Sequence, residues 1–181
     1  MKSGLMLAGS FNGGDGNSGR RNNNYYAHGR VPDSCHPGVR AITRYWESIH
    51  PPQGLPGRQH FDPVAIPSLL PNIRLIDVVG PPFRFRVRLT GTRLTEFFGA
   101  SDTGRWMDEI YPNFEETEPY GNYVQICETR SPNWHIGHCQ LRSQSECLEY
   151  ERVQLPFASD GETVDMILVY GVFGTAGDML R

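Results

Sequence analysis

The sequence lacks an excess of charge of either sign. Its 181 residues include 17 Lys and Arg against 20 Asp and Glu, which gives a formal net charge of −3. A protein that binds nucleic acid or an acidic membrane surface usually gathers Lys and Arg on one face, and no basic amphipathic stretch occurs here. We therefore expect neither nucleic acid nor a membrane among its partners.

Long apolar runs and paired cysteines are also missing. No segment approaches the roughly 20 apolar residues that a membrane-spanning helix needs, and the apolar start at 1–9 is too short and glycine-broken for a signal peptide. The four cysteines are Cys35, Cys127, Cys139 and Cys147. They form no Cys-x-x-Cys pair, a pattern that favours free thiols over a disulfide framework. These absences favour a cytoplasmic protein.

Recognisable catalytic motifs are absent from the sequence too. It has no glycine-flanked nucleophilic serine, no Walker loop, no dinucleotide fingerprint and no His-Glu-x-x-His pair. Acids such as Asp77, Glu128 and Asp165 occur, but no pattern brings two carboxylates together for acid–base chemistry. We therefore predict that the protein is not an enzyme.

The amino-terminal segment, residues 1–36, has little apolar material. It is rich in Gly, Asn, Ser and Arg. Folding it would bury too little apolar surface to offset an ordering entropy of about 1–2 kcal/mol per residue. The sequence therefore predicts a flexible tail at 1–36, one folded domain at 37–174 and a short carboxy-terminal tail at 175–181.

What is present begins with an amphipathic helix after Pro37, which ends at the two prolines that follow His50. Its apolar stripe at helical spacing consists of Val39, Ile42, Trp46 and Ile49. A helix with one apolar stripe needs a surface to lie on. We expect this stripe to cover a sheet of its own chain or to form a docking or dimer face.

Two strands follow, at 73–79 and 83–90. The first is apolar on both faces, and the second alternates apolar and polar residues as a half-buried strand does. The residues expected to face the core are Phe83, Phe85, Val87 and Leu89. The intervening Arg84, Arg86 and Arg88 then lie on the other face. We interpret them as a solvated face, with a docking patch as the alternative.

Short helices and three further strands complete the domain. Helices are expected at 92–98, around 106–110 and at 117–129, and strands at 134–141, 148–155 and 164–173. This order predicts an α+β fold with one five-stranded antiparallel sheet, of which the middle helices cover one face. Because the first and last strands are apolar on both faces, the helix after Pro37 is expected to cover the other face.

The element order and a set of short motifs resemble a known family. The motifs include Leu55-Pro56-Gly57-Arg58, Phe61-Asp62-Pro63, Leu69-Leu70-Pro71, the strand from Phe83 to Thr92, Phe98-Gly99, Thr103-Gly104, Leu155-Pro156 and Asp160-Gly161. They make residues 38–173 similar to a stand-alone bacterial PAS-like family, first described as a domain of unknown function. The resemblance implies a PAS fold, with strand order 2-1-5-4-3, and a sensor, dimerisation or docking role in signal transduction. It implies no agreed cofactor.

PAS domains hold ligands between their helices and their sheet. Four residues of this chain would surround that gap, namely Trp106, Tyr123, Cys127 and Trp134. Ordinary core filling is the competing interpretation, because aromatic stripes usually pack. We predict no cofactor, with haem or another small ligand as the alternative.

One segment, from Trp134 to Cys139, combines His and Cys side chains that can bind zinc or haem iron. On a strand, His135 and His138 point to opposite faces, and Cys139 shares a face with His135. At most two ligands would then meet on one face. We therefore predict no metal site.

These observations favour a non-catalytic signalling or sensor module that acts by protein–protein interaction, and optionally binds a small ligand. Its expected partner is a second copy of itself or a signalling protein such as a sensor kinase. One alternative is a small cone-shaped enzyme of the ketosteroid-isomerase type, whose long helices precede most of its sheet. The other alternative is a haem-binding sensor of the PAS kind.

Overall fold

The computed structural model describes residues 25–98, 101–140 and 147–174, without the side chains of residues 25, 138–140 and 147–148. Its strands are β1 (Tyr25–His28), β2 (Ile73–Val79), β3 (Arg84–Thr90), β4 (Asn133–Gln140), β5 (Cys147–Phe157) and β6 (Met166–Gly174). Its α-helices are α1 (Pro37–Ser48), α2 (Thr92–Phe98), α3 (Met107–Ile110) and α4 (Glu118–Thr129). Short 3-10 turns lie at Arg58–His60, Pro63–Ala65, Leu70–Asn72 and Phe114–Glu116. Within these residues no helix has the length and apolar character to cross a membrane.

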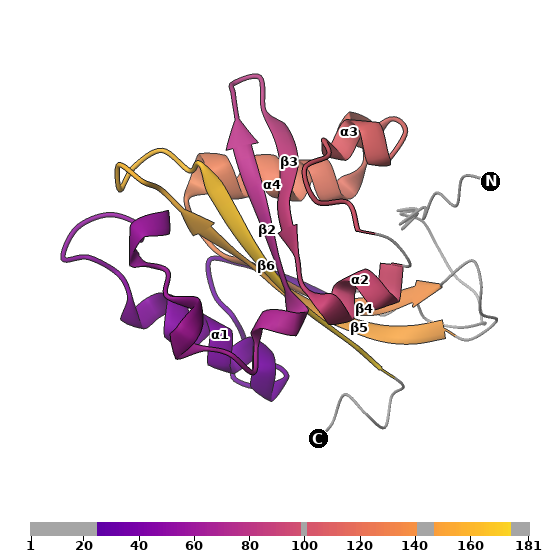
Figure 1. Cartoon of the computed structure of the whole chain (residues 1–181), viewed down its shortest axis with the longest axis horizontal. Helices are drawn as coiled ribbons and strands as arrows, with labels where there is room; N and C mark the ends of the chain where they lie inside the picture. Colours follow the sequence, from indigo (N-terminus) through magenta and orange to yellow (C-terminus); the bar gives the residue numbers. More distant parts are fainter. Residues whose placement is uncertain (1–24, 99–100, 141–146, 175–181) are drawn as a thin grey trace, which may run out of the picture.

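All of these strands form one antiparallel sheet with the order β1-β4-β5-β6-β2-β3 (Figure 1). The predicted α+β class is confirmed, but the predicted number of five strands is wrong. The added strand, β1, falls inside the segment 1–36 that the sequence predicts to be a tail, and it pairs with β4 at the sheet edge. The observed strand order therefore differs from the predicted one. The sequence did not predict β1 because its four residues are too few to show an alternation of apolar and polar side chains. The strand forms by backbone pairing with β4.

The hairpin between β2 and β3 depends on Gly80, which has a φ of +136°. A Cβ atom at this position would lie 2.2 Å from the carbonyl oxygen of Pro82. Only glycine fits such a backbone without strain. The turn then lets β3 lie beside β2 at the sheet edge.

Strand β3 follows the predicted alternation over only part of its length. Phe85 and Val87 are buried, as expected, and Phe83 is half-buried. Leu89, however, is 45% exposed, so its predicted core position is wrong. The pairing register shifts between Leu75 and Ile76 of β2, and such an irregularity reverses which residues face the core.

Helix α1 begins as its sequence predicts. The Nδ1 atom of His36 accepts a hydrogen bond from the backbone N–H of Gly38 at 3.0 Å, and Pro37 occupies the first turn. Near its end, the indole N–H of Trp46 donates to the carbonyl oxygen of Pro156 on β5 at 2.9 Å. The backbone N–H of His36 also donates to Glu151 of β5, so both ends of the helix are attached to the sheet.

The apolar stripe of α1 is buried in the chain's own core. Val39, Ile42 and Trp46 are buried, and Ile49 is partly buried and packs against the same core. The interpretation of this stripe as a docking or dimer face is therefore wrong for these side chains. They cover the sheet instead, which was the alternative expectation.

The remaining helices cover the opposite face of the sheet, and α4 passes behind β2 and β6 in Figure 1. Successive residues of β5 show the two sides. Glu151 accepts hydrogen bonds from the backbone of His36 at the start of α1, whereas Arg152 and Gln154 lie close to Tyr123 of α4. Both faces of the central strands are thus covered, and the layer between the sheet and α4 positions the site.

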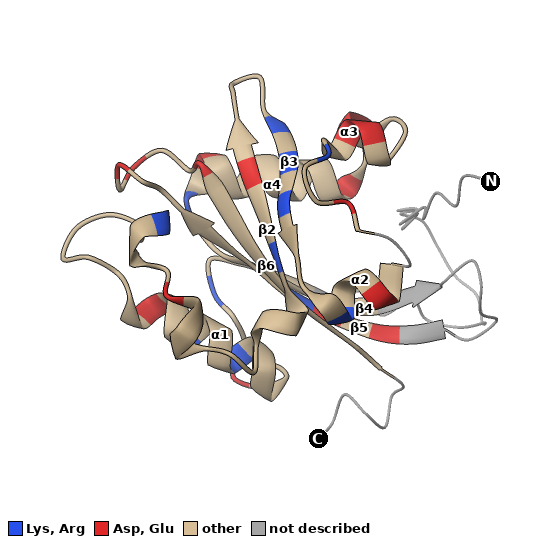
Figure 2. Cartoon of the chain, in the orientation of Figure 1, with Lys and Arg blue, Asp and Glu red and all other residues tan. Residues whose placement is uncertain are grey.

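The arginines of β3 lie on the exposed edge of the sheet, where Figure 2 shows them beside acidic residues of β2 and α3. Arg84 donates to Asp108 at 2.9 Å and to Glu109 at 3.3 Å. Arg86 and Arg88 both donate to the carboxylate of Asp77. This is a solvated face whose charges are balanced within the chain, so the structure gives no support to a docking patch there.

Candidate functional site

Several polar side chains are buried on the sheet face that α2, α3 and α4 cover. We call them the buried polar cluster, which consists of Arg74, Asp102, Asn122, Asn133, His135, Arg152 and Gln154. Each is at most 8% exposed. A buried polar group is costly unless it is hydrogen-bonded, and a buried charge is costly unless it is paired. Their number at one place makes the cluster the candidate site.

Strand register brings half of the cluster together. Arg152 of β5 lies opposite His135 of β4 and opposite Gly171 of β6. Gln154, two residues further along β5, lies on the same face opposite Asn133. The neighbouring side chains therefore follow from the β4–β5–β6 pairing alone.

Tyr123 of α4 stands over the middle of the cluster. It is buried, and its ring lies 5.0 Å from that of Phe85. Burial raises the pKa of Tyr123, against the opposing effect of Arg152 and Arg74, so its hydroxyl stays protonated at neutral pH. It lies beside the amide of Gln154 without completing a well-formed hydrogen bond to it.

The two arginines of the cluster differ in how their charge is balanced. Arg74 donates to Asp102 at 3.0 Å, and its guanidinium carbon lies 5.4 Å from the centre of the Phe98 ring. Arg152 is 7% exposed, and no described carboxylate lies within 4.0 Å of its guanidinium. Its close neighbours are tyrosines, including Tyr150, whose ring centre is 5.9 Å away. Arg152 is therefore a buried cation without a described counter-ion.

Several polar atoms of the cluster have no hydrogen-bond partner among the residues that the structure describes. They are Nε of Arg74, Nε of Arg152, Nδ2 of Asn122, Oδ1 of Asn133, both ring nitrogens of His135 and both amide atoms of Gln154. Each such group costs about 1–3 kcal/mol relative to a paired one. Both donors and acceptors are among them, so one bound molecule with both kinds of group would satisfy several of them.

His135 takes part in the cluster as a neutral ring. Burial, and then the nearby charge of Arg152, lowers the pKa of His135 to about 3. Tyr26 stacks on the imidazole at a centroid distance of 4.2 Å. Burial, and then a hydrogen bond with Glu118, raises the pKa of Tyr26. The unpredicted strand β1 thus supplies one wall of the site.

Of the four residues predicted to line a pocket, the structure places only Tyr123 against the cluster. Trp134 lies on the opposite face of the sheet, where its indole N–H donates to Glu151 at 2.7 Å. The prediction therefore assigned Trp134 to the wrong face of β4. The next residue, His135, is the one that faces the helices.

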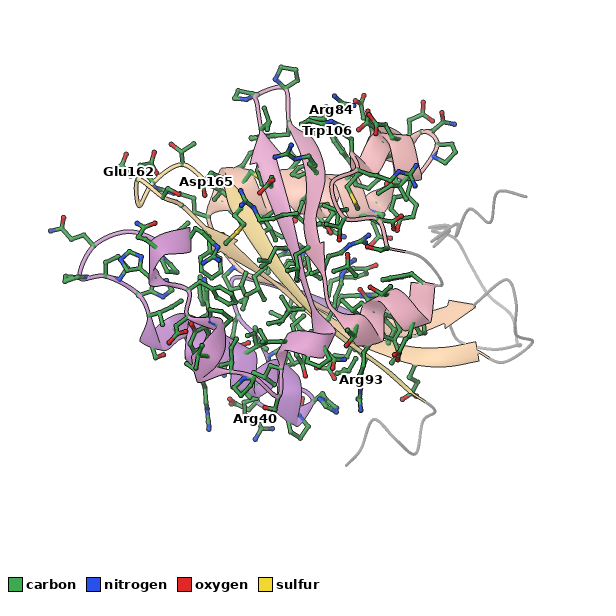
Figure 3. The ribbon with its side chains drawn as sticks, viewed as in Figure 1. Arg40, Arg84, Arg93, Trp106, Glu162 and Asp165 are labelled. Carbon is green, nitrogen blue, oxygen red and sulfur yellow. The ribbon has the colours of Figure 1, made fainter. Side chains whose placement is uncertain are left out.

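The other two predicted pocket residues also lie outside the cluster. Trp106 sits at the edge of β3, with the guanidinium of Arg84 4.1 Å from its ring centre (Figure 3). Cys127 is partly buried on α4, where burial, and then Glu128, raises the pKa of the thiol to about 12. It is a core side chain, and the core-filling interpretation holds for it.

Sequence reasoning missed most of the cluster, although one signal was available. Arg152 and Gln154 are two apart on a strand with neighbours on both sides, so their shared face had to be covered. Polar residues at such positions are the informative exceptions in a core. Asp102 gave no comparable signal, because it lies in a loop that only the fold brings to Arg74.

Metal binding is not indicated by the described part of the chain. No group of three or more His, Cys, Asp or Glu side chains in it is placed to hold a metal ion. Of the predicted His–Cys segment, the side chains of His138 and Cys139 lie outside the described ones. The expectation that the protein binds no metal or haem stays a prediction.

A family model described as a PAS domain matches residues 34–172, which confirms the resemblance found in the sequence. Among solved structures, an RNA-binding light-oxygen-voltage receptor is similar at 15% identity and a TM-score of 0.42. The similarity covers 67% of this chain and 36% of the receptor chain, so this chain spans about a third of that protein's length. A search of curated proteins gave no match.

Proposed function

This chain belongs to the PAS domain family, and from that premise we propose that it is a non-catalytic sensor module. Its input is the binding of a small ligand at the buried polar cluster, and its output is contact with a second protein. The observation that carries the proposal is Arg152, a buried cation with no described carboxylate beside it. An apolar side chain of similar volume would serve a purely structural core as well or better.

The acid of the cluster supports binding over catalysis. Asp102 is held by Arg74 at 3.0 Å and lies 3.6 Å from Arg105. An isomerase of the ketosteroid type uses a carboxyl that is free to take a proton from its substrate. The element order also differs from that fold, because β2 and β3 precede the helices α2, α3 and α4 here.

The output we propose is a change in contact with a second copy of the chain or with a cytoplasmic signalling protein such as a sensor kinase. The family's general role supports this kind of partner. The cluster also touches elements at the surface: Tyr26 of β1 stacks on His135, and Tyr123 belongs to α4. A ligand held between them would change the packing of both elements.

The input is tested by native mass spectrometry of the full chain after incubation with a bacterial metabolite extract. We expect a small molecule to bind to the wild type and to be released on denaturation, chemically unchanged. Binding should be lost in Arg152→Met and kept in the control Arg93→Met, whose arginine is exposed on α2 (Figure 3). Equal binding to both variants, or no bound molecule at all, would remove the cluster as the input site.

The output is tested by sedimentation of the full chain with and without the released molecule. We expect the ligand to change the self-association constant, or the affinity for a sensor kinase from the same cell, in the wild type only. If ligand binding altered neither, the signalling role would be wrong even with the site intact. A released molecule that is chemically converted would instead favour an enzyme.

A further inference from the structure

We propose that the ligand of the buried polar cluster is a small organic carboxylate that also carries a hydroxyl or amino group. The inference rests on the proposed function, since it assigns a chemical class to the ligand of that same site. Four features of the cluster lead to this class: its net charge, the geometry of Arg152, its unpaired acceptors and the room beside Gly171.

The first feature is the charge of the cluster. Arg74 and Asp102 form a buried ion pair with no net charge. Arg152 adds one positive charge, because arginine stays protonated in proteins, and no described carboxylate lies within 4.0 Å of it. A buried single charge is stabilised best by an opposite charge in direct contact. The cluster therefore favours a ligand with a net negative charge.

The second feature is the unpaired Nε of the Arg152 guanidinium. Its N–H has no hydrogen-bond partner among the described residues. A guanidinium is a planar fork that matches the two oxygens of a carboxylate through parallel N–H···O bonds. A carboxylate bound at this side would pair Nε and balance the charge with one group.

The third feature is the set of unpaired acceptors. Oε1 of Gln154 and Oδ1 of Asn133 accept no hydrogen bond from the described part of the chain, and these residues lie directly opposite each other. A bare carboxylate offers them nothing, whereas a hydroxyl or an amino group donates to them. Gln154 is two residues from Arg152, which corresponds to about 7 Å along a strand. The second group should therefore stand two to four carbons from the carboxylate.

The fourth feature is the room beside Gly171, which lies opposite Arg152 on β6. A Cβ atom there would contact Phe173 and Tyr150 at 3.6 Å and Leu94 at 3.7 Å, which are ordinary van der Waals distances. The chain would accept alanine at this position without strain, but the added methyl group would take space next to Arg152. Glycine at this position therefore leaves room for a methyl group next to Arg152 that no side chain of β6 fills.

The test is calorimetric titration of the full chain with three matched sets of probes. The first set is 3-hydroxypropionate, 4-hydroxybutyrate and 5-hydroxypentanoate; the second is their neutral amides; the third is propionate, butyrate and pentanoate, which lack the hydroxyl. We expect a member of the first set to bind at least about tenfold more tightly than its amide and than its counterpart without the hydroxyl, since each comparison removes one hydrogen-bonded group. Equal affinity for the amide, or no binding by the first set, overturns the assignment.

Variants test whether the probes bind at the buried polar cluster. Arg152→Met should weaken it by about 30-fold or more, because truncation of one partner of a buried charge pair is costly. Arg152→Lys should weaken binding by less than Arg152→Met does, since lysine keeps the positive charge but lacks the planar guanidinium. Gly171→Ala should weaken binding while leaving the thermal midpoint unchanged, and Arg93→Met should change nothing. Unchanged affinity in Arg152→Met overturns the proposal.

The two proposals fail in distinguishable ways. A neutral or cationic molecule that is released from the native protein and depends on Arg152 overturns the carboxylate class and leaves the sensor site in place. The absence of any Arg152-dependent molecule in both experiments overturns the site itself.

Discussion

Glu151 and Arg152 follow each other on β5 and face opposite sides of one sheet. Glu151 is 3% exposed, and its carboxylate accepts hydrogen bonds from the backbone N–H of His36 at 3.0 and 3.1 Å and from the indole of Trp134 at 2.7 Å. Arg152 is also buried, yet its Nε has no partner among the described residues. Two opposite charges one residue apart do not pair, because successive side chains of a strand point away from each other.

The difference separates a structural face from a functional one. On the α1 face, the buried acid holds the start of the helix and the indole of Trp46 donates to Pro156. These buried groups are satisfied by the chain itself. On the α4 face, Arg152 and Gln154 leave hydrogen-bonding atoms unpaired. Buried polar groups without hydrogen-bond partners usually occur where function requires them.

The largest effect is expected on the α1 face, at Trp46. Trp46→Ala should lower the free energy of unfolding by about 3–5 kcal/mol, because it removes a buried indole and leaves a cavity. Urea denaturation measures this change. Val64→Ala, at a side chain that is 81% exposed, is the control and should change stability by less than about 0.5 kcal/mol. A loss below about 1 kcal/mol at Trp46 would show that α1 does not stabilise this face.

The comparison itself is tested by the matched pair Glu151→Met and Arg152→Met. The first should cost about 2–4 kcal/mol, since it leaves the N–H groups of His36 and Trp134 buried without an acceptor. The second should leave the stability of the ligand-free protein unchanged or raise it by about 1 kcal/mol, because an unpaired buried charge is removed. Denaturant unfolding of both variants measures these two changes in stability. The reverse order of stabilities would contradict the division into two faces.

His135 provides a test through pH. Its pKa is about 3 in the folded chain and about 6.5 in an unfolded one, so the unfolded state binds more protons below about pH 6.5. Stability should therefore fall as the pH falls, by about 2 kcal/mol between pH 7 and 5 for this residue alone. His135→Gln should lose this part of the pH dependence.

The control for the pH experiment is His60→Gln, at an exposed histidine of a 3-10 turn. It should keep the pH dependence of the wild type. If unfolding curves of wild type and His135→Gln stayed parallel from pH 7 to 5, His135 would not be held neutral by its surroundings.

The smallest effect is expected at the solvated edge of the sheet. Arg84→Ala removes the ion pairs with Asp108 and Glu109, in which the side chains of both partners are in contact with solvent. Such pairs contribute little, and salt screens them. We expect the thermal midpoint to change by less than about 3 °C, and by less again in high salt. A larger, salt-insensitive change would indicate that the contact with Trp106 matters more than the charges.

The sequence by itself determined the local elements of this protein. The spacing of Val39, Ile42 and Trp46 predicts α1 because a helix repeats every 3.6 residues, and the alternation at Phe85 and Val87 predicts β3 because a strand repeats every two. The order of these elements predicted the antiparallel sheet, and together with the short motifs it indicated the family. These features depend on neighbours in the chain, so a linear pattern contains them.

Only the tertiary structure determined which of these residues are buried and which of them come into contact. The irregular register between β2 and β3 exposes Leu89, and β1 forms because β4 offers it a backbone edge. In the same way, the pairing of β4 with β5 and the packing of α4 determine that Arg152 lies beside His135 and Tyr123. These contacts join residues far apart in the chain, and their energies depend on burial that no local pattern specifies. For that reason the fold was largely predictable from the sequence, whereas of the site only Tyr123 was.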